Sequence, residues 1–162
     1  MSALTVPGIR HAEKPDERDA DLGPGLTVKG EKHSLVVRGR QRAGAWAVLF
    51  GARIGRPDFP APNIVYAANP DPSSSHDGSH GRGPFETIPP LCSRLHINPI
   101  TTYGVGDDVE LAKAVQQLAG VALICWEHKH IVNAILPALT AGQSLPNLPT
   151  EWDGAGFSRP PF

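Results

Sequence analysis

Four apolar runs along the chain have the length and composition of short β-strands. The first spans residues 4–9, and the others span residues 63–68, 97–103 and 121–126. The runs at 63–68 and 121–126 are apolar almost throughout, which is typical of central strands that are covered on both faces. We therefore expect these two segments to lie in the middle of a sheet.

Apolar positions between these runs recur with helical spacing. Helices are predicted over residues 35–50, 87–95 and 131–139, with Pro137 breaking or kinking the last one. In the first of these helices the spacing i, i+3, i+4, i+7 makes one apolar stripe of Ala43, Trp46, Ala47 and Phe50.

A further helix is predicted after Asp107, with Asp107 or Asp108 as its N-cap and Gly120 as its stop signal. Its buried face would comprise Leu111, Val115, Leu118 and Ala119. Strands thus alternate with helices, which predicts an α/β domain with a largely parallel sheet.

The length of 162 residues fits one domain over 1–162. A long polar connection spans residues 69–84, and the tail from about residue 143 is expected to pack loosely, because both are rich in loop-forming residues.

Charge and composition exclude some partners. The formal net charge of −1 gives no global field that would attract nucleic acid or an anionic membrane, and no apolar run reaches the length of a membrane span. The chain opens without a basic segment followed by an apolar one, so we expect no secretory signal. Cys92 and Cys125 lie in apolar segments and are predicted to be buried, reduced thiols of a cytoplasmic protein.

Candidate chemistry lies at the ends of two predicted strands. Arg10 and His11 end the first strand, and His128 follows the strand at 121–126. Ligands of parallel α/β sheets bind beyond the carboxyl ends of the strands, so the two histidines are expected to converge on one pocket. A guanidinium binds phosphate well, and a neutral imidazole offers a lone pair near pH 7.

Four motifs in order resemble the histidine phosphatase superfamily, the phosphoglycerate mutase-like phosphatases. Arg10-His11-Ala12-Glu13 is similar to the Arg-His-Gly-Glu signature of that family, and residues 35–43 resemble the Leu-x-x-x-Gly-x-x-x-Ala start of its first helix. Residues 64–68, the long loop after them and residues 82–90 resemble a segment in which a strand is followed by an arginine and Glu-Thr-x-x-Pro-Leu. Residues 121–128 resemble the strand that delivers a second histidine.

The resemblance implies a three-layer α/β/α sandwich and a phosphatase that hydrolyses a phosphomonoester, carried by a small molecule or a phosphoprotein. His11 would be the nucleophile that forms a covalent phosphohistidine. Arg10, Arg82 and His128 would bind the phosphoryl oxygens, where cationic donors stabilise the transition state. No metal or other cofactor would be required, since these side chains supply the positive charge.

The chain also departs from the family pattern. Ala12 replaces the usual glycine, and Arg82 lies one residue too far from Glu86-Thr87, so that Gly83 stands at the expected arginine position. The proton donor to the leaving group is left open between Glu13 and Glu127, with Asp107 as a third candidate. Residues 151–162 lack the final apolar strand that the family leads us to expect.

Two other functions compete with the phosphatase interpretation. His76 and His80, and likewise His128 and His130, have spacings at which metal ligands occur, but a zinc site usually has more or softer ligands, so we predict no metal. The main alternative is a non-catalytic member of the same fold that binds a phosphorylated ligand or a partner. The sequence does not fix the oligomeric state.

Overall fold

A computed structural model describes residues 3–16, 24–25, 32–53, 56–76, 80–143, 145–146 and 148–152. Its centre is a parallel sheet in which each of the other three strands pairs with β4. The strands are β1 (Leu4–Thr5), β2 (Gly8–Arg10), β3 (Ile64–Ala67) and β4 (Gly120–Trp126). The prediction of an α/β fold with a mostly parallel sheet is confirmed.

β1 and β2 are two parts of one extended segment along the same edge of β4. Leu4 pairs with Gly120 and Gly8 pairs with Ile124, so the register is unchanged across the interruption. Pro7 lies at the interruption and has no N–H for the ladder, although its carbonyl accepts a hydrogen bond from the N–H of Ile124 at 2.9 Å.

β3 pairs with the other edge of β4, with Tyr66 opposite Ile124. The strand expected at 97–103 is reduced to a single bridge between Tyr66 and Ile100. Pro99 precedes this bridge and cannot donate to a ladder, which accounts for the shortness of the pairing.

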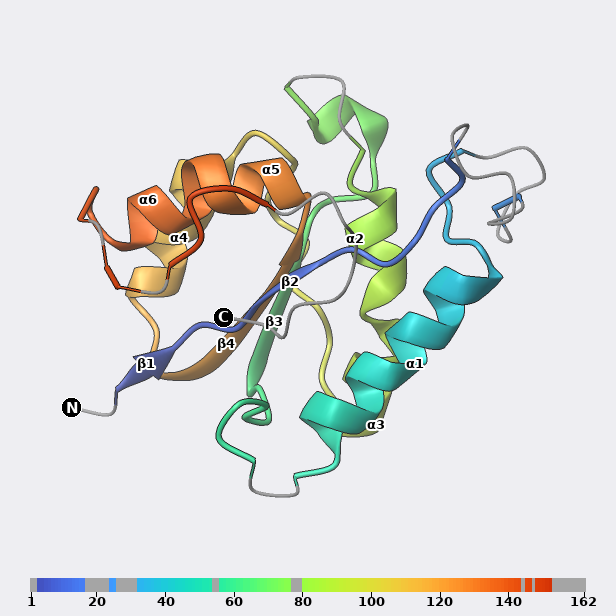
Figure 1. Cartoon of the computed structure of the whole chain (residues 1–162), viewed down its shortest axis with the longest axis horizontal. Coiled ribbons are helices and arrows are strands. Elements are labelled where there is room, and N and C mark those ends of the chain that lie inside the picture. The colour runs from blue at the N-terminus through green and yellow to red at the C-terminus, as the bar shows by residue number, and fades with distance from the viewer. Residues whose placement is uncertain are drawn as a thin grey trace.

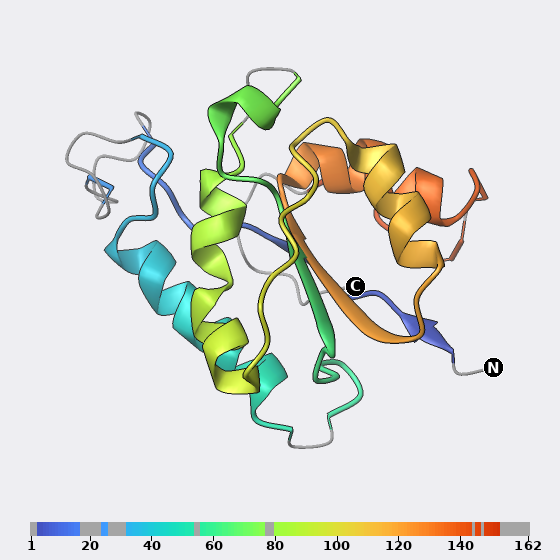
Figure 2. The ribbon, with the colours of Figure 1, turned by 180° about the vertical axis from the view of Figure 1, so that it is seen from behind.

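Helices cover both faces of the sheet (Figures 1 and 2). α1 (Val37–Gly51), α2 (Arg82–Thr87) and α3 (Pro89–Leu95) lie on one side. α4 (Asp108–Gln116) and a helical run of α5 (His128–His130), the π-helical η3 (Ile131–Ile135) and α6 (Leu136–Leu139) lie on the other. Side chains alternate along the strands, so each face of the sheet packs into its own apolar core.

Three local predictions differ from the structure. The end of the predicted loop 69–84 is helical, because α2 begins at Arg82 and places Pro84 in the first turn, where no N–H is needed. A short 3-10 turn, η2 (Pro72–Ser74), also lies in this loop. Gly120 does not stop α4; with φ of +90° it opens β4, and Ala119 is exposed rather than buried.

Both cysteines are buried and free, as predicted, and burial raises the pKa of the Cys92 thiol to about 11. In the described part of the chain, no helix is long and apolar enough to cross a membrane. Trp152, near the end of the described tail, packs partly buried against the core on the α4 side. The prediction for residues 151–162 falls mostly on positions 153–162, which lie outside the described residues.

Candidate active site

His11 continues the ladder of β2 by one residue. Its N–H donates to the carbonyl of Trp126 at 3.1 Å, which seats the residue at the carboxyl end of the sheet. Its ring Nδ1 lies 2.8 Å from the carbonyl oxygen of Ala12. A carbonyl only accepts, so this contact places the ring proton on Nδ1 and leaves the lone pair on Nε2. The residue is 4% exposed.

The imidazole is neutral at physiological pH. Burial lowers the pKa of His11 to about 3, and the charges of Lys14 and Arg10 act in the same direction. The Ala12 carbonyl and Glu127 raise this pKa but are outweighed. Lys14 had not been singled out from the sequence, although it lies only three residues after His11. It brings a further positive charge to this end of the sheet.

The turn after His11 is fixed by a threonine from a distant part of the chain. Thr87 accepts a hydrogen bond from the N–H of Ala12 at 2.9 Å and donates one to the carbonyl of Gly83 at 2.7 Å. Thr87 and Ala12 are both fully buried. The sequence motif contained Thr87, but its function as the tether of this turn was not predicted.

α1 approaches the same turn closely through Gly39. A Cβ on Gly39 would lie 2.2 Å from the carbonyl oxygen of Glu13, so only glycine fits there. That carbonyl accepts a hydrogen bond from the N–H of Val36 at 3.0 Å. The Glu13 carboxylate pairs with Arg42 of α1 at 2.9 Å. The turn is therefore held between α1 and α2.

The first turn of α2 presents Gly83, and not Arg82, to the histidine. A Cβ on Gly83 would lie 3.2 Å from Cγ and Nδ1 of the His11 ring. Successive residues of a helix point about 100° apart, so Arg82 points elsewhere. Its Nη1 lies 3.7 Å from Oε1 of Glu86. The arrangement thus puts the glycine at the position where the family pattern leads us to expect an arginine.

Glu86 is a buried carboxylate whose function the sequence did not reveal. It accepts hydrogen bonds from the hydroxyl of Ser34, from the N–H of Leu35 at 2.9 Å and from Arg40 at 2.8 Å. These bonds tie α2 to the residues that precede α1. One feature of the sequence could have revealed this residue, namely that Glu86 begins an otherwise apolar stretch. A glutamate in such a stretch is rarely buried unless it is paired, so its position indicates buried partners.

Glu127 organises the turn after β4. One of its oxygens accepts from the N–H groups of Lys129 and His130, at 2.8 and 3.2 Å, and so caps α5. The other lies 2.7 Å from Nδ1 of His128. Burial by itself would raise the pKa of Glu127, but these partners outweigh it and lower the pKa to about 2. The ring of Trp152 packs edge-on to His128, with the centroids 6.1 Å apart.

The sheet brings the predicted strand ends together. Arg10 pairs with Trp126, so His11 and His128 follow adjacent paired residues at one edge of the sheet. Glu127 lies close to His128, and its charge acts to raise the pKa values of His11 and Arg10, although burial lowers both overall. The convergence of the two strands that carry Arg10, His11 and His128 therefore follows from the register.

The three candidate proton donors each have a structural partner. Glu13 is bound by Arg42, and Glu127 is ionised and caps a helix. Asp107 lies 2.7 Å from Nε2 of His76 and accepts from the N–H of Gly104. In this state Glu127 has no proton to donate at neutral pH.

Asp108, at the start of α4, stabilises the turn after β4. The sequence predicts it only as a candidate helix cap. It is 4% exposed, accepts from the indole N–H of Trp126 at 2.8 Å and lies 2.6 Å from Nδ1 of His130. These two partners flank the segment that carries His128. A buried carboxylate thus fixes the chain on both sides of the second histidine.

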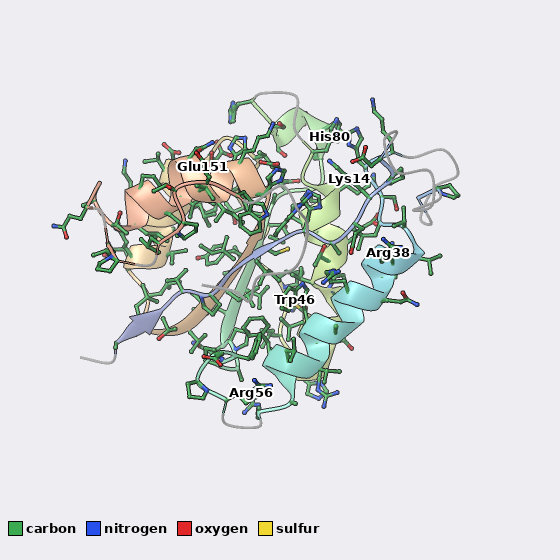
Figure 3. The ribbon with its side chains drawn as sticks, in the orientation of Figure 1. Lys14, Arg38, Trp46, Arg56, His80 and Glu151 are labelled. Atoms are coloured by element: carbon green, nitrogen blue, oxygen red, sulfur yellow. The ribbon has the colours of Figure 1, made fainter. Side chains whose placement is uncertain are left out.

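The histidines whose spacing in the sequence resembles that of metal ligands have other contacts in the structure. His76 faces Asp107, and His80 stacks on His33 with the ring centroids 3.5 Å apart. Lys14 and His80 are found at the same end of the molecule (Figure 3). Within the described ranges, no group of three or more His, Cys, Asp or Glu side chains is arranged to hold a metal ion.

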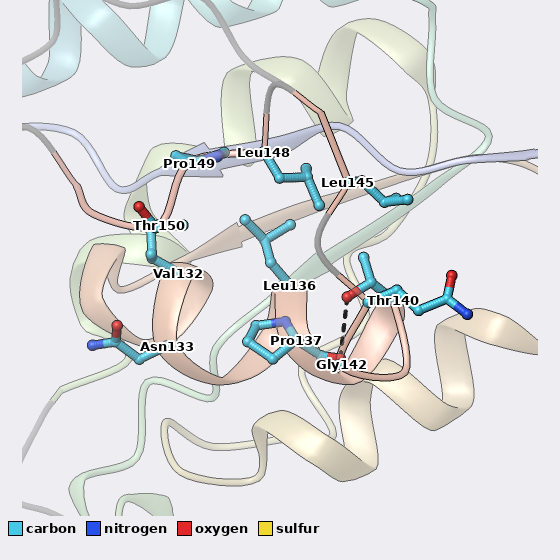
Figure 4. A pocket seen from close by; sticks show the side chains of 11 residues that line it. Val132, Asn133, Leu136, Pro137, Thr140, Gly142, Leu145, Leu148, Pro149 and Thr150 are labelled. Carbon is cyan, nitrogen blue, oxygen red and sulfur yellow. Dashed lines mark hydrogen bonds between the residues drawn. The ribbon is translucent and has the colours of Figure 1, made fainter.

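A hollow of about 350 Å³ lies between the helical run and the tail (Figure 4). Val132, Leu136, Leu145 and Leu148 make its apolar surface. None of the described residues that line it carries a titratable side chain. These residues therefore offer no group for acid–base chemistry.

Comparison with known proteins leaves the family open. No protein-family model matches the chain, and a search of curated proteins finds no match. The function must therefore be argued from the residues and their geometry.

Proposed function

We propose that this protein is a metal-independent phosphatase that hydrolyses phosphomonoesters through a phosphohistidine on His11. The observation that carries the proposal is the tautomer of His11. Its Nδ1 is committed to the Ala12 carbonyl, so the lone pair lies on Nε2 of a ring that stays neutral at pH 7. The phosphoglycerate mutase-like character of the fold is part of the same proposal.

The reaction balances with the groups at the edge of the sheet. Nε2 of His11 attacks phosphorus while the ester P–O bond breaks, and the leaving oxygen takes its proton from solvent water or from a carboxylic acid of the site. Water then attacks the phosphohistidine, the P–N bond breaks, and inorganic phosphate leaves with the lone pair restored to Nε2. Arg10 and Lys14 supply positive charge for the phosphoryl oxygens during both steps, and His128 offers a ring N–H donor.

The test compares the parent with His11→Asn for turnover of p-nitrophenyl phosphate. This substrate has a good leaving group, so its rate depends little on a protein acid. His96→Asn is the matched control, because His96 is exposed and has φ of +56°, a conformation that asparagine tolerates. We expect turnover by the parent and the control, and a loss of at least about a thousandfold in His11→Asn, in the range seen when a nucleophile is removed.

A second readout detects the intermediate directly. Acid-labile, alkali-stable phosphate bound to the parent after rapid quenching, and absent from His11→Asn, would support the covalent route. Equal turnover by both proteins, or bound phosphate unaffected by the substitution, would refute it.

The leaving-group acid can be identified by kinetics. Phenyl phosphate needs a proton donor more than p-nitrophenyl phosphate does, so a variant that lacks the acid loses more activity on phenyl phosphate. Glu13→Gln and Glu127→Gln are the two variants to compare. A selective loss on phenyl phosphate in either variant would identify the acid, and an equal loss on both substrates would assign the residue to structure instead.

The second candidate function is binding of a phosphorylated ligand without turnover. It is favoured by one observation, namely that Gly83 and not an arginine faces His11. Phosphate binding by a parent protein that shows no His11-dependent turnover would establish it.

A further inference from the structure

A hollow of about 530 Å³ lies against a face of α2 that neighbours the face packed on His11. It is bounded by α1, by the loop that follows β3 and by the outer face of α2 and α3. Its walls carry Arg40, Arg82, Asn69 and Phe85, and three prolines add apolar surface. The hollow thus combines cationic donors, two carboxylates and an apolar wall that includes the Phe85 ring.

Arg82 is the less tightly paired of the two arginines in this hollow, whose lining also carries the carboxylates of Glu86 and Asp71. The neighbouring Glu86 carboxylate already accepts hydrogen bonds from Ser34, Leu35 and Arg40. Arg82 lies 3.7 Å from Glu86, beyond hydrogen-bond distance, and its side chain is one third exposed. Its guanidinium can therefore bind a ligand without breaking a short ion pair.

Helix geometry explains why Arg82 faces the hollow. Gly83 and Thr87, four residues apart, form the face of α2 that packs on His11 and the turn after it. Arg82 and Glu86, also four apart, form the neighbouring face that lines the hollow. The one-residue shift relative to the family pattern therefore moves the guanidinium from the His11 side to this hollow.

A neutral donor and an acid complete the lining. The side-chain oxygen of Asn69 accepts from the N–H of Asp71, and so the amide N–H₂ of Asn69 remains as a donor. The Asp71 carboxylate caps the turn at Ser73 and lies at the fully exposed edge of the hollow. Its negative charge opposes anion binding, which gives the test a variant with an effect of opposite sign.

We propose that this hollow binds a second, non-transferred anionic group of the substrate, a carboxylate or phosphate on a flat apolar body, with Arg82 as its charged ligand. The proposal rests on the proposed phosphatase function. The substrate class that follows is a phosphomonoester with a second anionic group within about one helix diameter, roughly 10 Å, of the phosphoryl group.

The first experiment measures binding without catalysis. Calorimetric titration with 1-naphthoate, a flat apolar carboxylate, compares the parent with Arg82→Gln, Arg82→Lys and Asp71→Asn. Arg38→Ala is the matched control, because it removes an exposed charge from α1 (Figure 3). We expect binding about tenfold weaker in Arg82→Gln, partly restored in Arg82→Lys, and several-fold tighter in Asp71→Asn, since asparagine still caps Ser73. No binding by the parent, or equal binding by Arg82→Gln, would overturn the proposal.

The second experiment measures the effect on turnover. Aryl phosphates with a carboxylate on spacers of one to six methylenes are compared with the same compounds carrying a neutral amide. We expect the carboxylate to raise kcat/KM about tenfold at one spacer length in the parent, and this advantage to vanish in Arg82→Gln. A loss shared equally by carboxylate and amide substrates would overturn the proposal, because Arg82 would then serve the transferred phosphoryl group.

The two experiments separate this proposal from the phosphatase function. If no substrate is turned over while naphthoate binding still depends on Arg82, the phosphatase function fails and the anion site stands as a binding site. If turnover depends on His11 but naphthoate does not bind, the phosphatase function stands and the second anion site fails.

Discussion

Replacing Thr87 by valine tests the tether that holds the turn after His11. Valine has nearly the same shape as threonine but lacks the hydroxyl group. The substitution leaves the fully buried N–H of Ala12 without its acceptor and removes the bond to the Gly83 carbonyl. A buried donor without a partner costs about 1–3 kcal/mol, and we expect the free energy of unfolding to fall by about 2–3 kcal/mol.

The matched control is Thr87→Ser, which keeps both hydrogen bonds and removes one buried methyl group. Its expected cost is about 1 kcal/mol, from the lost apolar burial and the small cavity. Urea unfolding followed by circular dichroism measures both variants, and exchange of the Ala12 amide hydrogen reports on the turn itself. We expect exchange to become faster in Thr87→Val only.

If apolar burial alone decided the stability, Thr87→Val would be more stable than Thr87→Ser, because valine is the more apolar side chain and the site is fully buried. A Thr87→Val protein that is as stable as Thr87→Ser, or more stable, would refute the tether. Unchanged protection of the Ala12 amide in Thr87→Val would refute it as well.

Three further predictions concern the packing and charge of the same region. Gly39→Ala should destabilise the protein by more than about 1 kcal/mol, because the new Cβ would meet a backbone carbonyl at 2.2 Å. Gly44→Ala on the same helix meets nothing within 4 Å and should stabilise the protein by about 0.5–1 kcal/mol. Thermal unfolding of the two variants measures this difference. The pKa of His11 falls to about 3 in the folded state, so the unfolded state binds more protons between about pH 3 and 6.5. The free energy of unfolding should therefore fall by up to about 1.4 kcal/mol per pH unit as the pH is lowered through this range. His11→Asn should flatten this slope, and an unchanged slope would contradict the lowered pKa of His11. Asp108→Ala should cost about 2–4 kcal/mol in urea unfolding because the buried indole N–H of Trp126 loses its acceptor, and a cost below 1 kcal/mol would show that the brace is dispensable.

The strands and their polar ends could be predicted from the sequence. The run that became β4 is apolar because both of its faces are buried, and that requirement is written in consecutive residues. The placement of His11 and His128 at the ends of strands followed from the same pattern. α2 was missed because its first turn contains Gly83 and Pro84, which usually indicate a loop.

The arrangement around the candidate site could not be read from the sequence. The bond from Ala12 to Thr87 joins residues 75 positions apart, and the contact of Asp108 with His130 joins residues 22 positions apart. Such contacts depend on how far a helix is rotated about its axis when it packs on the sheet. The rotation of α2 decided which of two consecutive residues, Arg82 or Gly83, faces the histidine.

The sequence by itself thus determined the class of fold and which side chains end the strands, because hydrophobic periodicity is a local property that each segment carries alone. Only the tertiary structure decided the tautomer and charge of His11, the tether at Thr87 and the side of α2 on which the Arg82 guanidinium lies. These depend on partners brought together from distant segments, and on the loss of water around them, which no single segment specifies.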